Sequence, residues 1–169
     1  MNVDRKTALK ILTERCEEKV VLHSYAVRDL ALNLAKKSKV DLNIPLIEVG
    51  AILHDIGRSK THGAAHGFFG AKIAQQLGIS EDVVHIIERH VGGGISEEDA
   101  ELLGLSKKEY IPKTPEEKLV SYADKCISED RIIPIEDTIE RFAKTHGNSH
   151  SAVLLLRKLK KDVEENILQ

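Results

Sequence analysis

Six residues with imidazole or carboxylate side chains stand where a metal ion could collect them: His23, His54, Asp55, His66, His90 and Asp124. They come from five separate stretches of the chain. Imidazole nitrogens and carboxylate oxygens, with no thiolate among them, suit iron, manganese, cobalt, nickel or zinc. The residue types therefore predict a metal centre and leave the identity of the metal open.

The adjacent pair His54 and Asp55 follows the apolar segment VGAIL and precedes Ile56 and Gly57. Because a glycine lets the chain leave a helix, we expect a buried helix to end here. Near a helix terminus both side chains can face a single ion, and a carboxylate can also bridge two ions. A hydrogen-bonded helix end would explain an isolated His-Asp pair, but the other candidates favour a metal centre.

Each remaining candidate belongs to a different predicted helix. We expect His23 at the start of the helix SYAVRDLALNLA, His66 at the start of GFFGAKIAQQLG, and His90 at the end of EDVVHIIERH. Asp124 lies inside the segment LVSYADK. His62 shortly precedes His66 and is an alternative ligand to it. Several helices must therefore point side chains toward a shared centre.

The elements that must position these residues are helical by their apolar spacing. Apolar residues recur at three- and four-residue intervals, as in Ala26, Val27, Leu30, Ala31 and Leu34. No strand-like alternation of useful length appears. The sequence thus predicts an all-α fold, a compact bundle of about seven to eight helices.

Several helix starts carry recognisable signals. Asp4 and Ser80 are suited to cap helices, and Pro45 is suited to the first turn of another. Thr114 and Pro115 supply a cap and a first-turn proline for the helix that carries the last acidic candidate. Short helices with short connections are therefore expected.

The remaining segments differ in helical character. Two C-terminal helices are predicted at about 135–145 and 149–168, separated by a Gly-Asn break. Segments 57–65 and 91–113 are weakly helical, and such segments often surround a site. The glycines at 92–94 are expected to form a mobile loop or to contact phosphate through their backbone.

The composition is that of an ordinary soluble globular protein, with 31% charged and 41% hydrophobic residues. Its 169 residues suit one domain over 1–169, with the metal-site core at about 20–130 and the C-terminal helices at about 135–168. No apolar run approaches the roughly 20 residues of a membrane span. The N-terminal segment lacks the apolar centre of a secretory signal, so we expect a cytoplasmic protein without a membrane partner.

Charge and cysteine usage exclude other classes. The formal net charge is -2 and the basic residues form no run, so a duplex nucleic acid is not an expected partner. Cys16 and Cys126 stand apart from each other and from any CxxC spacing. We interpret both as reduced core residues rather than as a disulfide or a thiolate metal site.

The order of the candidate ligands resembles that of the HD superfamily of metal-dependent phosphohydrolases, over about residues 20 to 130. The resemblance is carried by four motifs in family order: HDIG at 54–57, His66 followed by Gly70-Ala71, Ile87-x-x-His90, and Ala123-Asp124-Lys125. It implies the helical HD fold and a metal-dependent hydrolase.

His66 and His90 match positions that distinguish a two-metal subclass of this superfamily. The resemblance implies two divalent ions: one held mainly by His23, His54 and Asp124, the other by His66 and His90, with Asp55 bridging them. Within the subclass the chain is most similar to bacterial diadenosine tetraphosphate hydrolases, which also have an arginine several residues after an ADK-like segment, as Arg131 follows Asp124 here.

Three cations are candidates for contacts with substrate phosphate: Arg58, Lys125 and Arg131. Guanidinium and ammonium groups stabilise charge on a phosphoryl group in transfer. Arg58 stands where the family often has lysine, and Arg89-His90 and VGGG replace the paired histidines and GYP motif of cyclic-dinucleotide enzymes. These departures disfavour cleavage of cyclic-di-GMP.

The expected function is hydrolysis of a phosphate ester or anhydride in a nucleotide or dinucleotide. Two ions about 3.5 to 4 Å apart would supply hydroxide at neutral pH and neutralise a phosphoryl oxygen, with Asp55, Arg58, Lys125 and Arg131 as the catalytic candidates. A non-catalytic nucleotide-sensing or interaction module and a mixed-valence di-iron oxygenase are the alternatives. A homo-oligomer is possible on the sequence alone.

Overall fold

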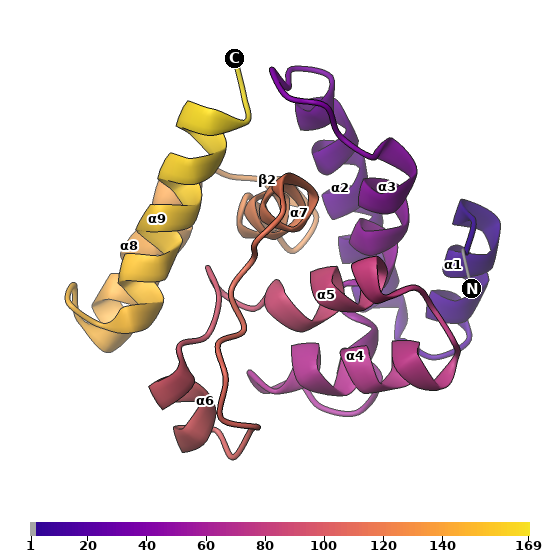
Figure 1. Ribbon diagram of the computed structural model, residues 1–169, viewed down its shortest axis with the longest axis horizontal. Helices are drawn as coiled ribbons and strands as arrows, with labels where there is room; N and C mark the ends of the chain where they lie inside the picture. The colour runs from indigo at the N-terminus through magenta and orange to yellow at the C-terminus, as the bar shows by residue number, and fades with distance from the viewer. Residues whose placement is uncertain (1–2) are drawn as a thin grey trace.

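A computed structural model describes residues 3–169, and Figure 1 shows its arrangement of helices. Within these residues the chain forms nine α-helices, one short 3-10 helix and one pair of two-residue strands. In chain order these are α1 (Arg5–Thr13), α2 (Glu18–Ala35), α3 (Ile44–Leu53), η1 (Ile56–Ser59), α4 (His66–Gln76), α5 (Glu81–Arg89), α6 (Glu97–Leu102), α7 (Pro115–Lys125), β1 (Ile127–Ser128), β2 (Arg131–Ile132), α8 (Ile135–His146) and α9 (Ser151–Asn166). The predicted all-α class is confirmed.

Two of the expected capping residues begin helices through side-chain hydrogen bonds. The Asp4 side chain accepts a hydrogen bond from the Thr7 amide at 2.8 Å, and Thr114 accepts one from the Glu117 amide at 3.2 Å. Each bond satisfies a backbone donor that has no partner inside its helix. Ser80 does precede α5, but its side chain makes no capping hydrogen bond.

Two elements depart from the sequence prediction. Helix α6 lies inside the segment expected to be weakly helical, and it raises the number of helices above the predicted seven to eight. Ser96 caps it by accepting from the Asp99 amide at 3.1 Å. Its six residues bury only Ala100, so apolar spacing could not reveal it. The β1 and β2 strands pair antiparallel after α7.

Helix α3 connects the two main apolar clusters of the protein. Ile47 and Ala51 pack in a cluster with α2, α7, α8 and α9. Ile52 and Leu53 pack in a second cluster with α1, α4 and α5. Apolar residues of α3 face both clusters, so the C-terminal end of this helix is buried between them. The residues that follow α3 in the chain therefore also lie in the interior of the molecule.

Gly57 allows η1 to lie directly against the start of α4. A Cβ atom added to Gly57 would lie 1.8 Å from the His66 carbonyl oxygen and 2.6 Å from the Gly70 amide nitrogen. No side chain fits in that space. The glycine of the HDIG motif therefore fixes the distance between the end of α3 and the first residue of α4.

No helix within residues 3–169 combines the length and apolar character needed to cross a lipid bilayer.

Candidate metal centre

The structure brings all six candidate ligands to one place. His54 and Asp55 follow α3, His66 begins α4, and His90 follows α5. These four residues are buried, with relative exposures of 0%, 2%, 5% and 1%. His23 on α2 and Asp124 on α7 close the cluster on its more accessible side, where their side chains are 19% and 10% exposed.

Three of the histidines are oriented by the same kind of local hydrogen bond. In each, the Nδ1 atom bonds the backbone carbonyl three residues earlier, at a helix end or turn. The pairs are His54 with Ala51 at 2.7 Å, His66 with Gly63 at 2.8 Å, and His90 with Ile87 at 2.8 Å. Because Nδ1 donates its proton to a carbonyl, Nε2 carries the lone pair and faces the cluster.

His23 obtains the same orientation from a distant turn. The structure corrects the expected helix start, because α2 begins at Glu18 and places His23 in the second turn. Its Nδ1 bonds the Glu129 carbonyl oxygen at 3.2 Å. Glu129 lies between β1 and β2 with a left-handed φ of 59°. Sequence reasoning missed this contact, because a main-chain oxygen has no residue-type signature.

The two oxygens of Asp55 face different histidines. Asp55 Oδ1 lies 3.1 Å from His66 Nε2 and 3.3 Å from His90 Nε2. Asp55 Oδ2 lies 3.7 Å from His54 Nε2 and 3.9 Å from His23 Nε2. The carboxylate therefore stands between two groups of nitrogen lone pairs.

Asp124 joins one of these two groups. Its Oδ1 atom lies 2.9 Å from His23 Nε2 and 3.5 Å from His54 Nε2. Three overlapping sets of residues have ligand atoms within 4.8 Å of one another: His23, His54 and Asp55; His54, His90 and Asp124; and Asp55, His66 and His90. The donor atoms could hold more than one ion.

Several atoms in the cluster lack the partners that a metal-free core would provide. His54 Nε2 and Asp55 Oδ1 are buried and have no hydrogen-bond partner. His66 Nε2 and His90 Nε2 lie 3.0 Å apart, although both point lone pairs inward when Nδ1 holds the proton. An unsatisfied buried polar atom requires a missing partner, and a cation would satisfy all of these atoms at once. The residues therefore fit a metal centre.

The protonation of the acidic groups suits cation binding. Burial alone would raise the pKa of Asp55, but the facing imidazoles of His54, His66 and His90 hold it well below its usual range. Burial opposes ionisation of Asp124 as well, yet Lys125 and the neighbouring histidines hold its pKa well below the usual range. Both carboxylates are ionised at neutral pH.

The pKa values of the two most buried histidines are shifted in opposite directions. Burial lowers the pKa of His90 to about 4, so this imidazole is neutral at neutral pH. Burial also acts against a charge on His54, but Asp55 and Asp124 outweigh it and raise its pKa. A cation that enters the cluster therefore competes with a proton at His54.

The candidate cations for substrate phosphate lie in different places. Arg58 donates from Nε to Asp55 Oδ2 at 2.7 Å, and its side chain is 30% exposed toward the site. Lys125 pairs with Asp124 and is 12% exposed. Arg131 is exposed on β2 and does not line the pocket at the cluster. The prediction of a site role for Arg131 thus lacks geometric support.

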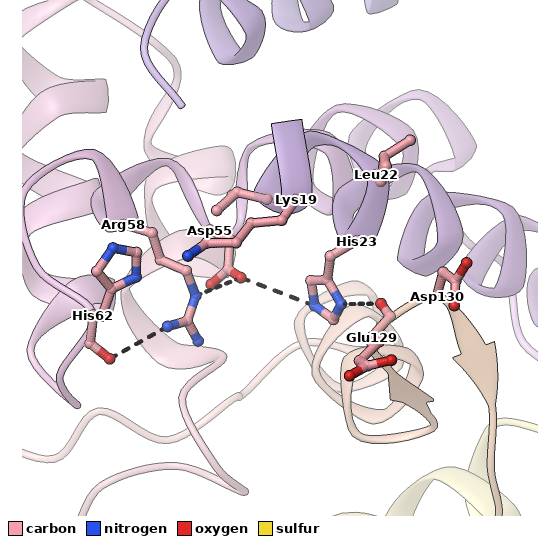
Figure 2. Close-up of a pocket in the computed structure, with 9 residues that line it drawn as sticks. Lys19, Leu22, His23, Asp55, Arg58, His62, Glu129 and Asp130 are labelled. Atoms are coloured by element: carbon pink, nitrogen blue, oxygen red, sulfur yellow. Dashed lines mark hydrogen bonds and ion pairs between the residues drawn. The ribbon is translucent and has the colours of Figure 1, made fainter. Parts of the chain in front are cut away.

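A pocket of about 560 Å³ opens over the exposed side of the cluster, and Figure 2 shows most of its lining side chains. Its lining residues are Lys19, Val20, Leu22, His23, Asp55, Arg58, His62, Glu129 and Asp130. The volume lies in the range of small-molecule sites, about 300–1,000 Å³. His62 therefore lies near the site, but it is in none of the three possible ligand sets.

The glycines at 92–94 do not cover this pocket. A Cβ atom added to Gly93 would lie 2.5 Å from backbone atoms of Leu155 and Leu156 on α9. The expectation of a mobile loop over the substrate is therefore wrong, because the small residues allow close packing of two backbones. Ser121 also braces this region by donating to the His90 carbonyl oxygen at 3.2 Å.

Arg89 serves the scaffold rather than the ions. Its Nη1 atom lies 3.0 Å from both carboxylate oxygens of Glu117 on α7, and the Glu117 side chain also accepts from the Lys113 amide at 2.8 Å. A buried ion pair of this kind contributes when its remaining hydrogen-bonding capacity is filled. It fixes α5 against α7 and thereby sets His90 relative to Asp124.

Comparison with known proteins agrees with this geometry. The family model of the HD domain matches residues 20–129. An uncharacterized protein of Methanocaldococcus jannaschii is 44% identical over 149 residues, which cover 86% of this chain and 88% of that protein. In solved structures, the HD domain of the L. monocytogenes phosphodiesterase PgpH in complex with cyclic-di-AMP has a TM-score of 0.56 at 18% identity, covering 96% of this chain and 99% of that one. This likeness shows the fold.

Two further relatives are longer proteins. A tRNA (cytidine(56)-2'-O)-methyltransferase of Picrophilus torridus is 37% identical over 161 residues, which are 95% of this chain and 46% of that protein. A Ribonuclease Y of Salinispora tropica is 35% identical over 91 residues, which are 53% of this chain and 13% of that protein. The chain therefore spans less than half the length of either relative.

Proposed function

This chain belongs to the HD-domain family, and from that membership and its site we propose that it is a metal-dependent phosphohydrolase acting on a nucleotide, a dinucleotide or a related phosphate compound. The observation that supports the proposal most strongly is the position of Asp55. Each of its oxygens faces a different pair of imidazole nitrogens. A carboxylate so placed can bridge two cations.

Two divalent ions would have separate sets of ligands here. His23, His54 and Asp124 would hold the first ion together with Asp55 Oδ2, and His66 and His90 would hold the second together with Asp55 Oδ1. Two bound ions supply hydroxide at neutral pH and neutralise charge on a phosphoryl oxygen. The mixed nitrogen and oxygen donors suit iron, manganese, cobalt, nickel or zinc.

The chain's own groups would bind and orient the phosphate. Arg58 is held by Asp55 through Nε and by the His62 carbonyl oxygen through Nη1, so its guanidinium is fixed beside the cluster and its other N–H groups can bind phosphate oxygens. Lys19 of α2 lines the same side of the pocket and adds a second positive charge. Lys125 neutralises Asp124 from behind and limits the negative charge that a substrate phosphate meets.

The relatives bear on the reaction class but do not define the substrate. The Ribonuclease Y match, over 53% of this chain, is to a protein whose name denotes cleavage of phosphodiester bonds in RNA. The name of the methyltransferase describes that whole protein, and this chain matches 46% of its length. We therefore propose phosphoryl hydrolysis and carry neither relative's substrate over to this chain.

The proposal is tested by measuring phosphate release from purified protein, chelated and then reloaded with manganese, iron, cobalt, nickel or zinc. The substrates are nucleotides, dinucleotides and a generic phosphodiester, and oxygen consumption is followed in parallel. We expect hydrolysis that requires metal and consumes no oxygen. Oxygen consumption with a hydroxylated substrate would indicate the di-iron oxygenase instead, and nucleotide binding without turnover would indicate a sensing module.

Two histidines of one helical segment provide a matched pair of variants. His90→Ala removes a candidate ligand, whereas His85→Ala removes an imidazole that is 37% exposed on α5. We expect the first variant to lose both metal and activity and the second to keep both. Equal activity of His90→Ala and the unaltered protein would exclude the proposed site.

A further inference from the structure

The pocket over the metal centre has sides of opposite charge. Figure 2 shows Arg58 and His62 on one side of Asp55 and His23, and Glu129 and Asp130 on the other. The side chains of Asp55 and His23 lie between them. A molecule bound over the centre would therefore contact the Arg58 guanidinium at one end and carboxylates at the other.

The acidic side of the pocket is held in a fixed position. Glu129 and Asp130 form the turn between β1 and β2. The Glu129 carbonyl bonds His23 Nδ1 at 3.2 Å, so the turn is fixed to a candidate ligand. Both side chains are exposed, and within residues 3–169 neither forms an ion pair with a cation of the chain. Their carboxylates are therefore available to contact a ligand in the pocket.

The part of the pocket wall contributed by α2 is partly apolar. Leu22 lines the pocket and is 52% exposed, and Val20 lines it as well. An exposed leucine beside a polar cluster can cover the apolar face of a sugar or a base. An organic group is thus accommodated between the metal centre and the solvent.

The proposed metal centre lies at the base of this pocket. Asp55 lines the pocket, is 2% exposed, and has a buried Oδ1 atom without a hydrogen-bond partner. The acidic turn therefore lies at the rim of a site that already lacks a ligand at its base. It is more than a solvated pair of acidic side chains.

We propose that Glu129 and Asp130 determine substrate specificity, by selecting a phosphate ester whose organic half carries hydroxyl or amine donors and no second phosphate. A nucleoside monophosphate has this chemistry. The proposal rests on the phosphohydrolase function proposed above and narrows its substrate class. The single phosphate lies at the metal centre and the cationic side, Leu22 covers the organic half, and the two carboxylates accept hydrogen bonds from its donors.

The physical reason is the sign of the charge at the acidic side. Carboxylates accept hydrogen bonds from neutral or cationic donors, whereas a second phosphate group there would be repelled by two like charges. A dinucleoside polyphosphate would place further phosphate groups near the acidic turn. The pocket therefore disfavours the substrate class of diadenosine tetraphosphate hydrolases.

The test compares adenosine 5'-monophosphate with adenosine 3',5'-bisphosphate, which has the same organic group and one more phosphate. For the metal-loaded full chain, kcat/KM for release of the 5'-phosphate and affinity by calorimetry are measured for both compounds. The variants are Asp130→Asn and the double variant Glu129→Gln with Asp130→Asn. We expect the double variant to shift discrimination toward the bisphosphate by about tenfold, because two like charges are removed.

The controls are Asp41→Asn and Glu109→Gln, which neutralise exposed carboxylates that do not line the pocket. They should leave the ratio between the two compounds unchanged. If Asp130→Asn and the double variant change both compounds by the same factor or by none, the proposed selectivity is wrong, because a merely structural effect through His23 acts on both alike. If no metal supports phosphate release, the hydrolase proposal fails, while the calorimetric affinities still decide the selectivity.

Discussion

Asp55 is the residue on which the proposed chemistry most depends. It follows the buried helix α3 and is 2% exposed. Its pKa is held well below the usual range despite burial, because imidazoles face it from several directions. An ionised carboxylate that is almost completely removed from water needs compensating positive charge. Arg58 supplies part of that charge at Oδ2, and a pair of divalent cations would supply the rest and explain why imidazole nitrogens face both oxygens.

Removal of this carboxylate should affect both ions. We expect Asp55→Ala to lower metal content and to reduce turnover by more than about a hundredfold, since even the loss of an outer hydrogen-bond partner of a ligand costs about 10–100-fold. Elemental analysis and phosphate release measure the two effects. Asp41→Ala, which changes an exposed carboxylate, is the control. Normal metal content in Asp55→Ala would rule out a bridging role.

Metal affinity should increase with pH until His54 is neutral. The neighbouring carboxylates raise the pKa of His54, so in the metal-free protein it keeps a proton to a higher pH than an ordinary histidine. Metal binding must release that proton, and each proton released adds up to about tenfold in affinity per pH unit below that pKa. His90, with a pKa of about 4, contributes no such dependence near neutrality.

This pH dependence can be measured by calorimetric metal titrations from acidic to alkaline pH in buffers of different ionisation enthalpy. The number of protons released per ion should fall as the pH rises and should vanish at alkaline pH. An affinity that is independent of pH would contradict the raised pKa of His54.

At the scale of the elements, helix ends and one hairpin turn orient the site. Three histidines bond carbonyls three residues earlier, and the fourth uses the Glu129 carbonyl. The histidines that make these bonds lie close together because α3 packs against apolar clusters on both sides and Gly57 lets α4 begin beside it. The orientation of the histidine side chains at the site thus depends on backbone groups as well as on side chains.

Gly57→Ala should disturb both the fold and the second ion. The added methyl group would collide with the His66 carbonyl, so we expect a loss of about 2 kcal/mol or more in unfolding free energy, together with weaker metal binding. Gly63→Ala is the matched control, because its nearest contact would be an ordinary 3.6 Å to the Thr61 hydroxyl. Denaturant unfolding and metal titration of both variants test this expectation, and equal behaviour of the two would refute it.

The sequence could predict most of the helices and the residues that gather at the candidate site, because both depend on residue type and order. The helix caps at Asp4 and Thr114 could be predicted for this reason, and so could the order of imidazoles and carboxylates. The pocket side chains Lys19 and Asp130 could not be predicted, because only the packing of α2 against the hairpin places them together. Arg131 was expected near the substrate phosphate, but it lies on β2, where its side chain is exposed.

At the scale of the whole molecule, the metal centre would connect the two apolar clusters. The candidate ligands lie on α2 and α7, which pack mainly in one cluster, and on α4 and at the end of α5, whose apolar residues pack mainly in the other. His54 and Asp55 extend from α3, which contributes to both. Ions held at this junction would cross-link the halves of the protein, so metal binding and folding should be coupled.

The coupling predicts a higher melting temperature for the metal-loaded protein. At a metal concentration of a hundred times Kd, one site stabilises the native state by about 2.7 kcal/mol, which raises Tm by about 5–10 °C for a chain of this size. Thermal unfolding with and without chelator measures the shift. His90→Ala should lose most of it and His85→Ala should retain it. A Tm independent of metal in the unaltered protein would count against a cross-linking centre.

The most direct test of the central claim is anomalous diffraction from crystals grown with manganese, recorded at the metal absorption edge. The account predicts two peaks about 3.5 to 4 Å apart, one beside each oxygen of Asp55, with His23, His54 and Asp124 around the first and His66 and His90 around the second. Crystals in which no anomalous peak lies among these six residues would contradict it.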